Sequence, residues 1–403
     1  MAGLAAILVL GACGYALFFY HHLHAAEEAN ARYDFDDAQG HLATCIRLWP
    51  RRAELHFLAA RTARRAGRFA EAMEHLNAFE GIEGKTPAYL LEYAMLRAQQ
   101  GDFESSGRYL IDLLEKDHPD STLILEALAQ GTNHVYHLGK SIHFAEGALQ
   151  REPGNVPMLL LHAHLWDSVN RFDDAEKDYR AAIDAQPGHA QARLELAQFL
   201  LRHDKADDAV EHFEQLRKRR YQLPAVLMGL ALCRRQQGRT AEERELLDAL
   251  LAESPDDPNA LAERGKLELE ADELNAAERD LRYALSQSPS DRQTTLHLAQ
   301  CLTRLGKDEE SAVYAGKLAQ LEADMKSLEE LIREIAKDPN NAEKLRQAGV
   351  ICLRNGIDQE AERWFLGAWQ LDPRYKPTNQ SLADLYTQRG RPDLAGPFRD
   401  AAR

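Results

Sequence analysis

The sequence predicts an all-α solenoid of stacked, antiparallel helix pairs, preceded by one membrane-spanning helix. Three observations lead to this prediction: an uncharged apolar run at the N-terminus, a 34-residue period in prolines and turn residues, and helical spacing of apolar residues within each period. A helix pair of this length cannot bury its apolar face alone, so it must stack on copies of itself.

The first segment, residues 1–22, is predicted to be a transmembrane anchor. Its first twenty residues carry no charge, and Gly3 to Tyr20 would form a helix of about 27 Å, against a hydrocarbon core of about 30 Å. A cleaved signal peptide and a lipoprotein remain alternatives, although no Lys or Arg precedes the run and the run continues past Cys13. Acidic residues dominate the flank that follows. We therefore expect a single-pass protein of a bacterial inner membrane, with its repeats on the extracytoplasmic side.

The repeat is clearest in Val156–His189, which contains two amphipathic stretches separated by Asn170-Arg171 and closed by Gln186-Pro187-Gly188. Prolines keep the period of 34 or its double, at Pro119, Pro153, Pro187, Pro255 and Pro289, and Pro339 and Pro373 resume it. The turn between the two helices keeps the same period. It falls at Tyr33, Gly67, Gly101, Tyr136, Asn170, Asp204, Gly238, Asp272, Gly306, Gly356 and Gly390. Because Gly, Asn and Asp tolerate positive φ, we expect a left-handed residue at each turn.

A small residue follows five places after nearly every turn, where two helices would cross closely; Glu243 is the exception. Together with Leu196-Ala197, Phe213 and the closing Asp338-Pro339, this pattern resembles the tetratricopeptide repeat. The resemblance covers roughly residues 20–403 and implies a right-handed superhelix that binds protein or peptide partners. The copies are divergent, because the bulky aromatic expected early in the first helix is absent.

The repeats divide into residues 23–316 and 338–403, with an extended helix at 317–337 between them. Lys317 to Lys337 contains no Gly or Pro and keeps helical apolar spacing, which predicts a second helix lengthened by about four turns. This helix is either a rigid spacer or a seam for a partner or for self-association. The second reading rests on the stripe Leu321, Met325, Leu328 and Ile332.

Charge and motifs exclude several classes of function. The formal net charge of −15 argues against general nucleic-acid binding. Gly139-Lys140-Ser141 lacks the earlier glycine of a phosphate-binding loop, and no HExxH or GxSxG motif occurs. We therefore expect no enzyme, no cofactor and no metal site. Cys45, Cys233, Cys301 and Cys352 stand at packing positions and are expected to be buried thiols.

The resemblance also implies where a partner would bind. In such superhelices the first helix of each pair lines a concave groove, and positions 2, 5, 9, 12 and 13 of the repeat point into it. The candidate partner-binding residues carried over in this way are Arg61, Arg65, Gln99, Asn133, Gln198, Arg202, Arg235, Lys266, Gln300, Arg304 and Arg354. Amides can bond an extended peptide backbone, and arginines suit carboxylates.

The favoured function is a membrane-tethered scaffold whose groove binds an extended, somewhat acidic polypeptide or a carboxylate-bearing tail during assembly or secretion. The alternative is an architectural or self-assembling membrane protein without a peptide ligand.

Overall fold

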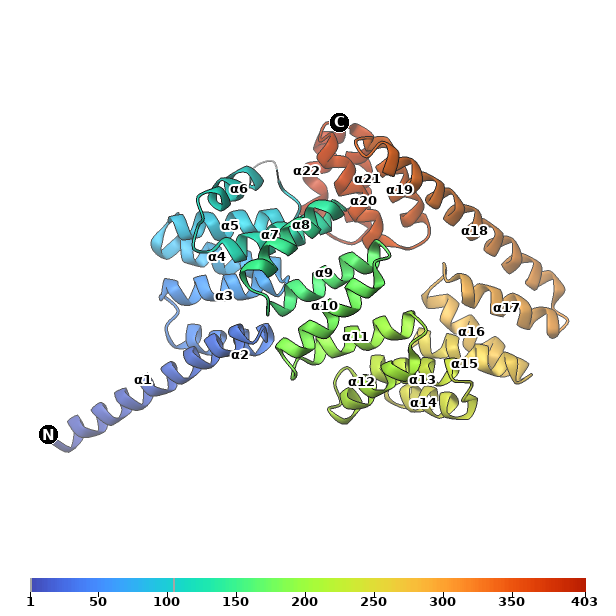
Figure 1. Cartoon of the computed structure of the whole chain (residues 1–403), viewed down its shortest axis with the longest axis horizontal. Helices are drawn as coiled ribbons and strands as arrows, with labels where there is room; N and C mark the ends of the chain where they lie inside the picture. The colour runs from blue at the N-terminus through green and yellow to red at the C-terminus, as the bar shows by residue number, and fades with distance from the viewer. Residues whose placement is uncertain (1, 104–105) are drawn as a thin grey trace. The chain divides into compact units, whose positions relative to one another are not determined.

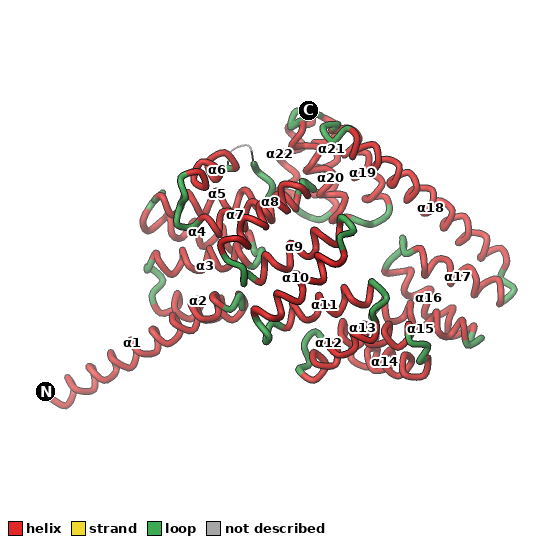
Figure 2. Tube along the Cα trace, in the orientation of Figure 1, coloured by secondary structure: helices red, strands yellow, loops and turns green. Residues whose placement is uncertain are grey.

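The chain folds into helices joined by short loops (Figure 2). The structure, a computed structural model, describes residues 2–103 and 106–403, without the side chains of residues 2–16. These residues form 22 helices and no strand, so the predicted all-α repeat fold is confirmed. The helices divide into two compact units, Met1–Pro187 and Gly188–Arg403, which are described separately below.

Unit 1 consists of ten helices among the described residues, arranged as consecutive antiparallel pairs (Figure 1). They are α1 (Ala2–Ala31), α2 (Phe35–Leu48), α3 (Ala53–Arg65), α4 (Phe69–Glu83), α5 (Pro87–Gln99), α6 (Gly107–Glu115), α7 (Ser121–His134), α8 (Leu138–Arg151), α9 (Val156–Ser168) and α10 (Phe172–Ala185).

Unit 2 continues the same arrangement with twelve helices. They are α11 (Ala190–Arg202), α12 (Ala206–Lys218), α13 (Leu223–Gln236), α14 (Thr240–Glu253), α15 (Pro258–Glu270), α16 (Leu274–Gln287), α17 (Arg292–Arg304), α18 (Asp308–Lys337), α19 (Ala342–Arg354), α20 (Asp358–Leu371), α21 (Lys376–Gln388) and α22 (Pro392–Ala402).

The turn inside each pair is made by one left-handed residue. All eleven predicted turn residues have positive φ, from 56° at Tyr33 to 90° at Gly101. Several loops between pairs end in side-chain caps: Asn155, Asp257 and Asp291 each accept a hydrogen bond from the backbone N–H of the third residue beyond them. These local signals explain why the predicted register is the observed one.

The core of each unit is formed where helices of a pair cross. Ala72, Ala175, Ala209 and Ala277 occupy the predicted crossing position and are completely buried. A residue without a bulky side chain lets the two backbones approach closely, so the core forms as a row of small clusters rather than one centre. Glu243 stands at the same position and is also buried.

The predicted membrane anchor is not supported by the structure. Over the part of the chain whose side chains are described, no helix is both long and apolar enough to cross a bilayer, so the predicted localisation as a single-pass membrane protein is wrong. The side chains of residues 1–16, most of the predicted segment 1–22, lie outside the described residues. At the end of the apolar run, Phe19 is buried, and its ring packs edge-on against Trp49 at 3.9 Å between centroids. This part of α1 thus belongs to the core of the first helix pair.

Helix α18 has 30 residues, about twice the length of the other second helices of unit 2. Its first part packs against α17, where the Ser311 hydroxyl donates to the Ala299 carbonyl. Its later part packs against α19, and Leu321 and Leu328 are buried. Two residues of the apolar stripe are therefore covered within the chain, whereas Ile332 is 42% exposed.

Candidate functional site

The candidate site is the face formed by the first helices of the pairs, which we call the first-helix face. It carries the eleven residues that the family resemblance selects. The structure divides them into two groups. Most of the arginines are already paired with carboxylates of the same unit, whereas Asn133 of unit 1 and three polar side chains of unit 2 have no such partner within the described residues.

In unit 1 the arginines of α3 belong to a buried ion-pair network. Arg61 donates to Glu92 at 3.1 Å and lies 3.4 Å from Asp120. Arg65 binds Glu126 through two hydrogen bonds of 3.1 and 3.2 Å. Because Arg65 lies on α3 and Glu126 on α7, its side chain reaches past α5, which requires a strongly concave first-helix face.

The centre of this network is the pair Arg64–Glu92, both at most 1% exposed and in direct hydrogen-bond contact. Arg64 also donates to the Gln99 side chain at 3.0 Å, and Gln99 in turn donates to Gln130. Gln99 is therefore occupied by internal contacts. Asn133 is half-buried and makes no side-chain hydrogen bond within the described part of the chain.

Two contacts connect the first turn of unit 1 with much later residues. The Tyr33 hydroxyl donates to Glu152 at 2.8 Å, and the Gln186 amide donates to the Arg32 carbonyl at 2.8 Å. Burial and the hydrogen bond to Glu152 raise the pKa of Tyr33, so the phenol stays protonated. The guanidinium of Arg65 stacks on the Tyr33 ring, which links these contacts to the ion-pair network.

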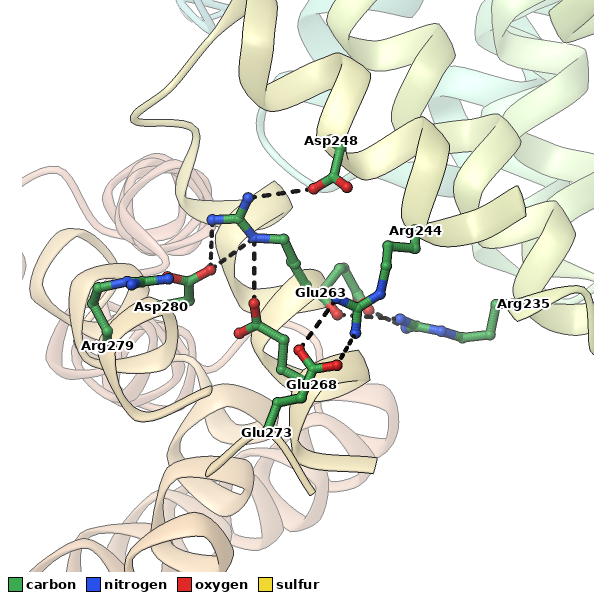
Figure 3. Close-up of polar contacts among 9 residues, drawn as sticks. Arg235, Arg244, Asp248, Glu263, Glu268, Glu273, Arg279 and Asp280 are labelled. Atoms are coloured by element: carbon green, nitrogen blue, oxygen red, sulfur yellow. Dashed lines mark hydrogen bonds and ion pairs between the residues drawn. The ribbon is translucent and has the colours of Figure 1, made fainter. Parts of the chain in front are cut away.

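In unit 2, Arg235 is held by two carboxylates. It contacts Glu243 on α14 and Glu263 on α15, and Figure 3 shows its guanidinium directed toward Glu263. Glu243 replaces the small residue expected at the helix crossing, and burial raises the pKa of its carboxyl. Glu243 is the exception in the series of small residues at the helix crossing, and this exception was the sequence signal for the pair of Arg235 and Glu243. The sequence analysis did not connect Glu243 with Arg235, which lies eight residues earlier.

A recurring contact links each pair to the one before it. Gln99, Gln236 and Arg304 all occupy position 13 of their repeats. Each bonds position 12 of the preceding repeat: the Arg64 side chain, the Leu201 carbonyl (3.1 Å) and the Leu269 carbonyl (2.6 Å), respectively. Arg304 also binds Asp272 at 2.5 Å. Arg202, at the same position in its repeat, is exposed and also has an interaction partner.

Arg354 occupies position 13 as well, but its partner lies on the extended helix α18. Its Nε and Nη2 donate to Asp324 at 2.7 and 2.5 Å, and Asn355 and Gln320 each donate to the same carboxylate at 3.0 Å. Burial alone would raise the pKa of Asp324, but the hydrogen bonds from Asn355, Gln320 and Arg354 lower it. In the three repeats described above, position 13 bonds the end of the preceding first helix. Here Asp324, on the second helix α18, is the partner instead.

Three of the predicted residues lie in unit 2 and have no polar side-chain contact within the described residues. Gln198, Lys266 and Gln300 make no side-chain hydrogen bond and no ion pair within the described residues, and each is at least partly exposed. Lys266 lies near His297, whose pKa is lowered by burial and then by the Lys266 charge. The nearby imidazole is thus kept neutral, and Lys266 has no ion-pair partner within the residues that the structure describes.

A second buried charge cluster in unit 2 was missed by the sequence analysis. Arg264 donates from Nε to Asp280 at 2.8 Å and lies 3.8 Å from Glu268 on its own helix. Glu268 is 5% exposed, and its Oε2 has no hydrogen-bond partner within the described residues. Burial and the charge of Asp280 raise the pKa of Glu268 to about 7. Its sequence signal was a charged pair, Arg264 and Glu268, at the spacing i, i+4 within one first helix.

One pocket opens on the first-helix face of the C-terminal repeats. It lies between α18 and α19 and has a volume of about 390 Å³. Its lining consists of Ser327, Glu330, Leu331, Glu334, Arg346, Gln347, Val350, Ile351 and Arg354. The predicted residue Arg354 is part of this wall.

Metal and thiol chemistry have little support in the structure. Within the described residues, no group of three or more His, Cys, Asp or Glu side chains is placed to hold a metal ion. Cys45, Cys233, Cys301 and Cys352 are buried free thiols, as predicted. Burial raises the pKa of both Cys233 and Cys352 to about 11, which leaves them as unreactive thiols.

Comparison with known proteins agrees with this architecture. The tetratricopeptide repeat family model matches residues 25–89, 161–213, 200–258 and 263–327, more than half of the chain. A search of curated protein sequences found no match. Similar solved structures include a tetratricopeptide repeat protein from Parabacteroides merdae, with 17% identity over 71% of this chain and 99% of that one and a TM-score of 0.38. PilW, a type IV pilus biogenesis factor, is 21% identical over 51% of this chain and 94% of its own, with a TM-score of 0.45. Yeast Tom70 is 12% identical over 96% of this chain and 92% of its own, with a TM-score of 0.38. Such identities indicate the fold alone. On its turn register, its crossing positions and the family match, the chain belongs to the tetratricopeptide repeat family.

Proposed function

We propose that this protein is a scaffold that binds an extended segment of a partner protein along the first-helix face of unit 2. The observation that carries the proposal is the difference between the two units. Polar groups on this face of unit 1 are largely bonded to one another, whereas Gln198, Lys266 and Gln300 in unit 2 are not.

These side chains suit a polypeptide ligand. An amide offers both a donor and an acceptor, so Gln198 and Gln300 can bond the N–H and C=O groups of an extended backbone. Lys266 adds a cation for a carboxylate on the partner. The arginines predicted for the same role have carboxylate partners of their own, so a partner would have to displace Glu263 from Arg235 or Asp272 from Arg304.

Site-specific photocrosslinking in the producing cells tests this proposal. A crosslinking amino acid at Gln198 or Gln300 is expected to capture the same protein, because both positions face one extended ligand. The control is Glu245, exposed on the second helix α14, where we expect no capture of that protein. Equal capture from Glu245, or none from either glutamine, would refute the proposal.

An architectural role without a peptide ligand is the second candidate, and unit 1 favours it. The buried network around Arg64 and the contacts of Tyr33 and Gln186 tie its helix pairs together. A surface whose charges are internally matched offers little to a ligand. Asn133 is the candidate of unit 1 that lies outside this network, and because the charges around it are matched we expect a crosslinker there to capture no partner.

A further inference from the structure

The pocket between α18 and α19, which we call the α18–α19 pocket, exists because α18 is long. Ser327, Glu330, Leu331 and Glu334 line one wall and lie beyond the point where the other second helices of unit 2 would have ended. The other wall contains Arg346, Val350 and Arg354, which are positions 5, 9 and 13 of the α19 repeat. These are positions that the family resemblance places in the groove. The insertion thus adds a second wall beside the groove positions of α19.

The cations of this pocket are already neutralised. Arg354 is bonded to Asp324 at 2.7 Å, and Arg346 binds Glu343 through two hydrogen bonds of 2.7 Å. The bonds from Arg346, and those from Gln347 and Tyr375, lower the pKa of Glu343 to about 2, so this pair stays charged at any physiological pH. Both guanidinium groups are therefore fixed in place, and their charge is matched within the chain.

The carboxylates of the opposite wall are not matched in this way. Glu330 is exposed and has no ion pair or side-chain hydrogen bond within the described residues. Glu334 has one contact, at 3.4 Å, with Lys344. The unmatched charge of the pocket is thus negative, in contrast to the basic groove that the sequence predicted.

The remaining lining is apolar and accessible. Leu331, Val350 and Ile351 line the pocket between the two charged walls, and Val350 is 38% exposed. An aliphatic side chain that is open to solvent gains from being covered, and 390 Å³ is enough for one or two large side chains of a ligand.

We propose that the α18–α19 pocket binds a short segment of a partner protein that places a large apolar side chain on Val350 and Leu331 and a lysine or arginine beside Glu330 and Glu334. This deepens the proposed function and rests on it, since it specifies one section of the same first-helix face. The neighbouring arginines act as fixed walls and exclude a second basic residue on that side.

Selection of random phage-displayed dodecapeptides on the purified full chain tests this proposal. We expect the enriched peptides to combine Leu, Ile, Met or Phe with Lys or Arg. A synthetic peptide of the enriched sequence, measured by fluorescence anisotropy, should lose about tenfold or more in affinity for the double variant Glu330→Arg, Glu334→Arg. Val350→Glu should weaken binding to a similar degree, because it places a charge on the apolar lining. Glu329→Arg is the matched control, since it reverses a charge on the exposed surface of α18 outside the pocket lining and should leave affinity within about twofold.

Several outcomes would overturn the assignment. Enriched peptides that are acidic, or a loss of affinity equal in Glu329→Arg and in the pocket variants, contradict it. If peptides bind and Lys266→Glu weakens them while the pocket variants do not, the pocket is refuted but the proposed function stands. If no peptide is enriched and the crosslinks at Gln198 and Gln300 are also absent, both fail. Circular dichroism of each variant excludes unfolding as the cause.

Discussion

The buried carboxyl of Glu268 should make unit 2 less stable as pH rises toward neutrality. Its neighbours are Arg264 on the same helix, Asp280 and Arg279 on α16, and Arg244 on α14. Arg264 is closer to Asp280 than to Glu268, at 2.7 Å against 3.8 Å. Ionisation of Glu268 therefore adds a second negative charge to a site whose guanidinium is already engaged. Burial and the negative charge of Asp280 both disfavour the ionised form of Glu268.

The size of the effect follows from the pKa, which changes from 4.5 to about 7 on folding. Since the folded state binds the proton more tightly, this group stabilises the fold fully below pH 4.5, and the contribution is lost as pH rises through 7. Between pH 5 and pH 8 the loss amounts to about 2.5 kcal/mol. For a unit of this size that is a decrease of roughly 5–10 °C in Tm.

The variant Glu268→Gln isolates this contribution, because an amide has the shape of the protonated acid but does not ionise. Thermal unfolding of both proteins is followed by circular dichroism at pH 5, 6, 7 and 8. The wild type should lose stability relative to Glu268→Gln as pH rises, with half of the change between pH 5 and pH 8 reached at about pH 6 and most of it by about pH 7. Glu245→Gln, exposed on α14, is the control and should run parallel to the wild type. A pH-independent difference between wild type and Glu268→Gln would show that this reasoning is wrong.

Three further predictions concern packing and burial. An ideal Cβ at Gly229 would lie 2.3 Å from the Phe213 ring, so Gly229→Ala should cost about 1–3 kcal/mol in chemical unfolding, and Phe213→Leu should recover part of it. Arg64→Met removes the buried partner of Glu92 and leaves this carboxylate only its contact with Arg61, so it should cost up to about 3–5 kcal/mol, whereas the double variant with Glu92→Leu should cost less than this single change. The Cys233 thiol should resist Ellman's reagent at pH 8 in the folded protein and react on unfolding, which mass spectrometry of the modified peptide would show.

The repeat register was predictable because each of its signals is local. A left-handed turn needs Gly, Asn, Asp or a tolerated exception such as Tyr33, and all eleven positions chosen on that ground have positive φ. Alanines at the crossing position are likewise predictable, because the two helix backbones approach each other too closely there for a bulky side chain. Such constraints act within a few residues, so a single sequence displays them.

The sequence did not predict in the same way which side chains of the first-helix face are paired with other residues of the chain. Position in the repeat placed Arg61, Arg65 and Arg235 on the first-helix face but gave no information on what they touch. Apart from Glu243, which also binds Arg235, their partners described above on neighbouring helix pairs include Glu92, Glu126 and Glu263, which lie 28 to 61 residues away. Whether an arginine is free for a ligand depends on these long-range contacts, which the period does not encode. These paired arginines therefore give the first-helix face less free positive charge than the candidate residues of the sequence indicate.

The long helix α18 shows how an insertion can preserve the inter-repeat contact and still create a new surface. In the regular repeats, position 13 bonds the end of the preceding first helix, as Gln236 does with Leu201. At Arg354 the same position bonds Asp324 on α18 instead. Asp324 therefore keeps the C-terminal repeats in contact with the rest of unit 2 while the added turns supply Glu330 and Glu334. Because the arginine is used for this contact, it does not neutralise Glu330, which has no ion pair within the described residues, and the proposed pocket therefore offers a ligand negative charge at this place in the groove.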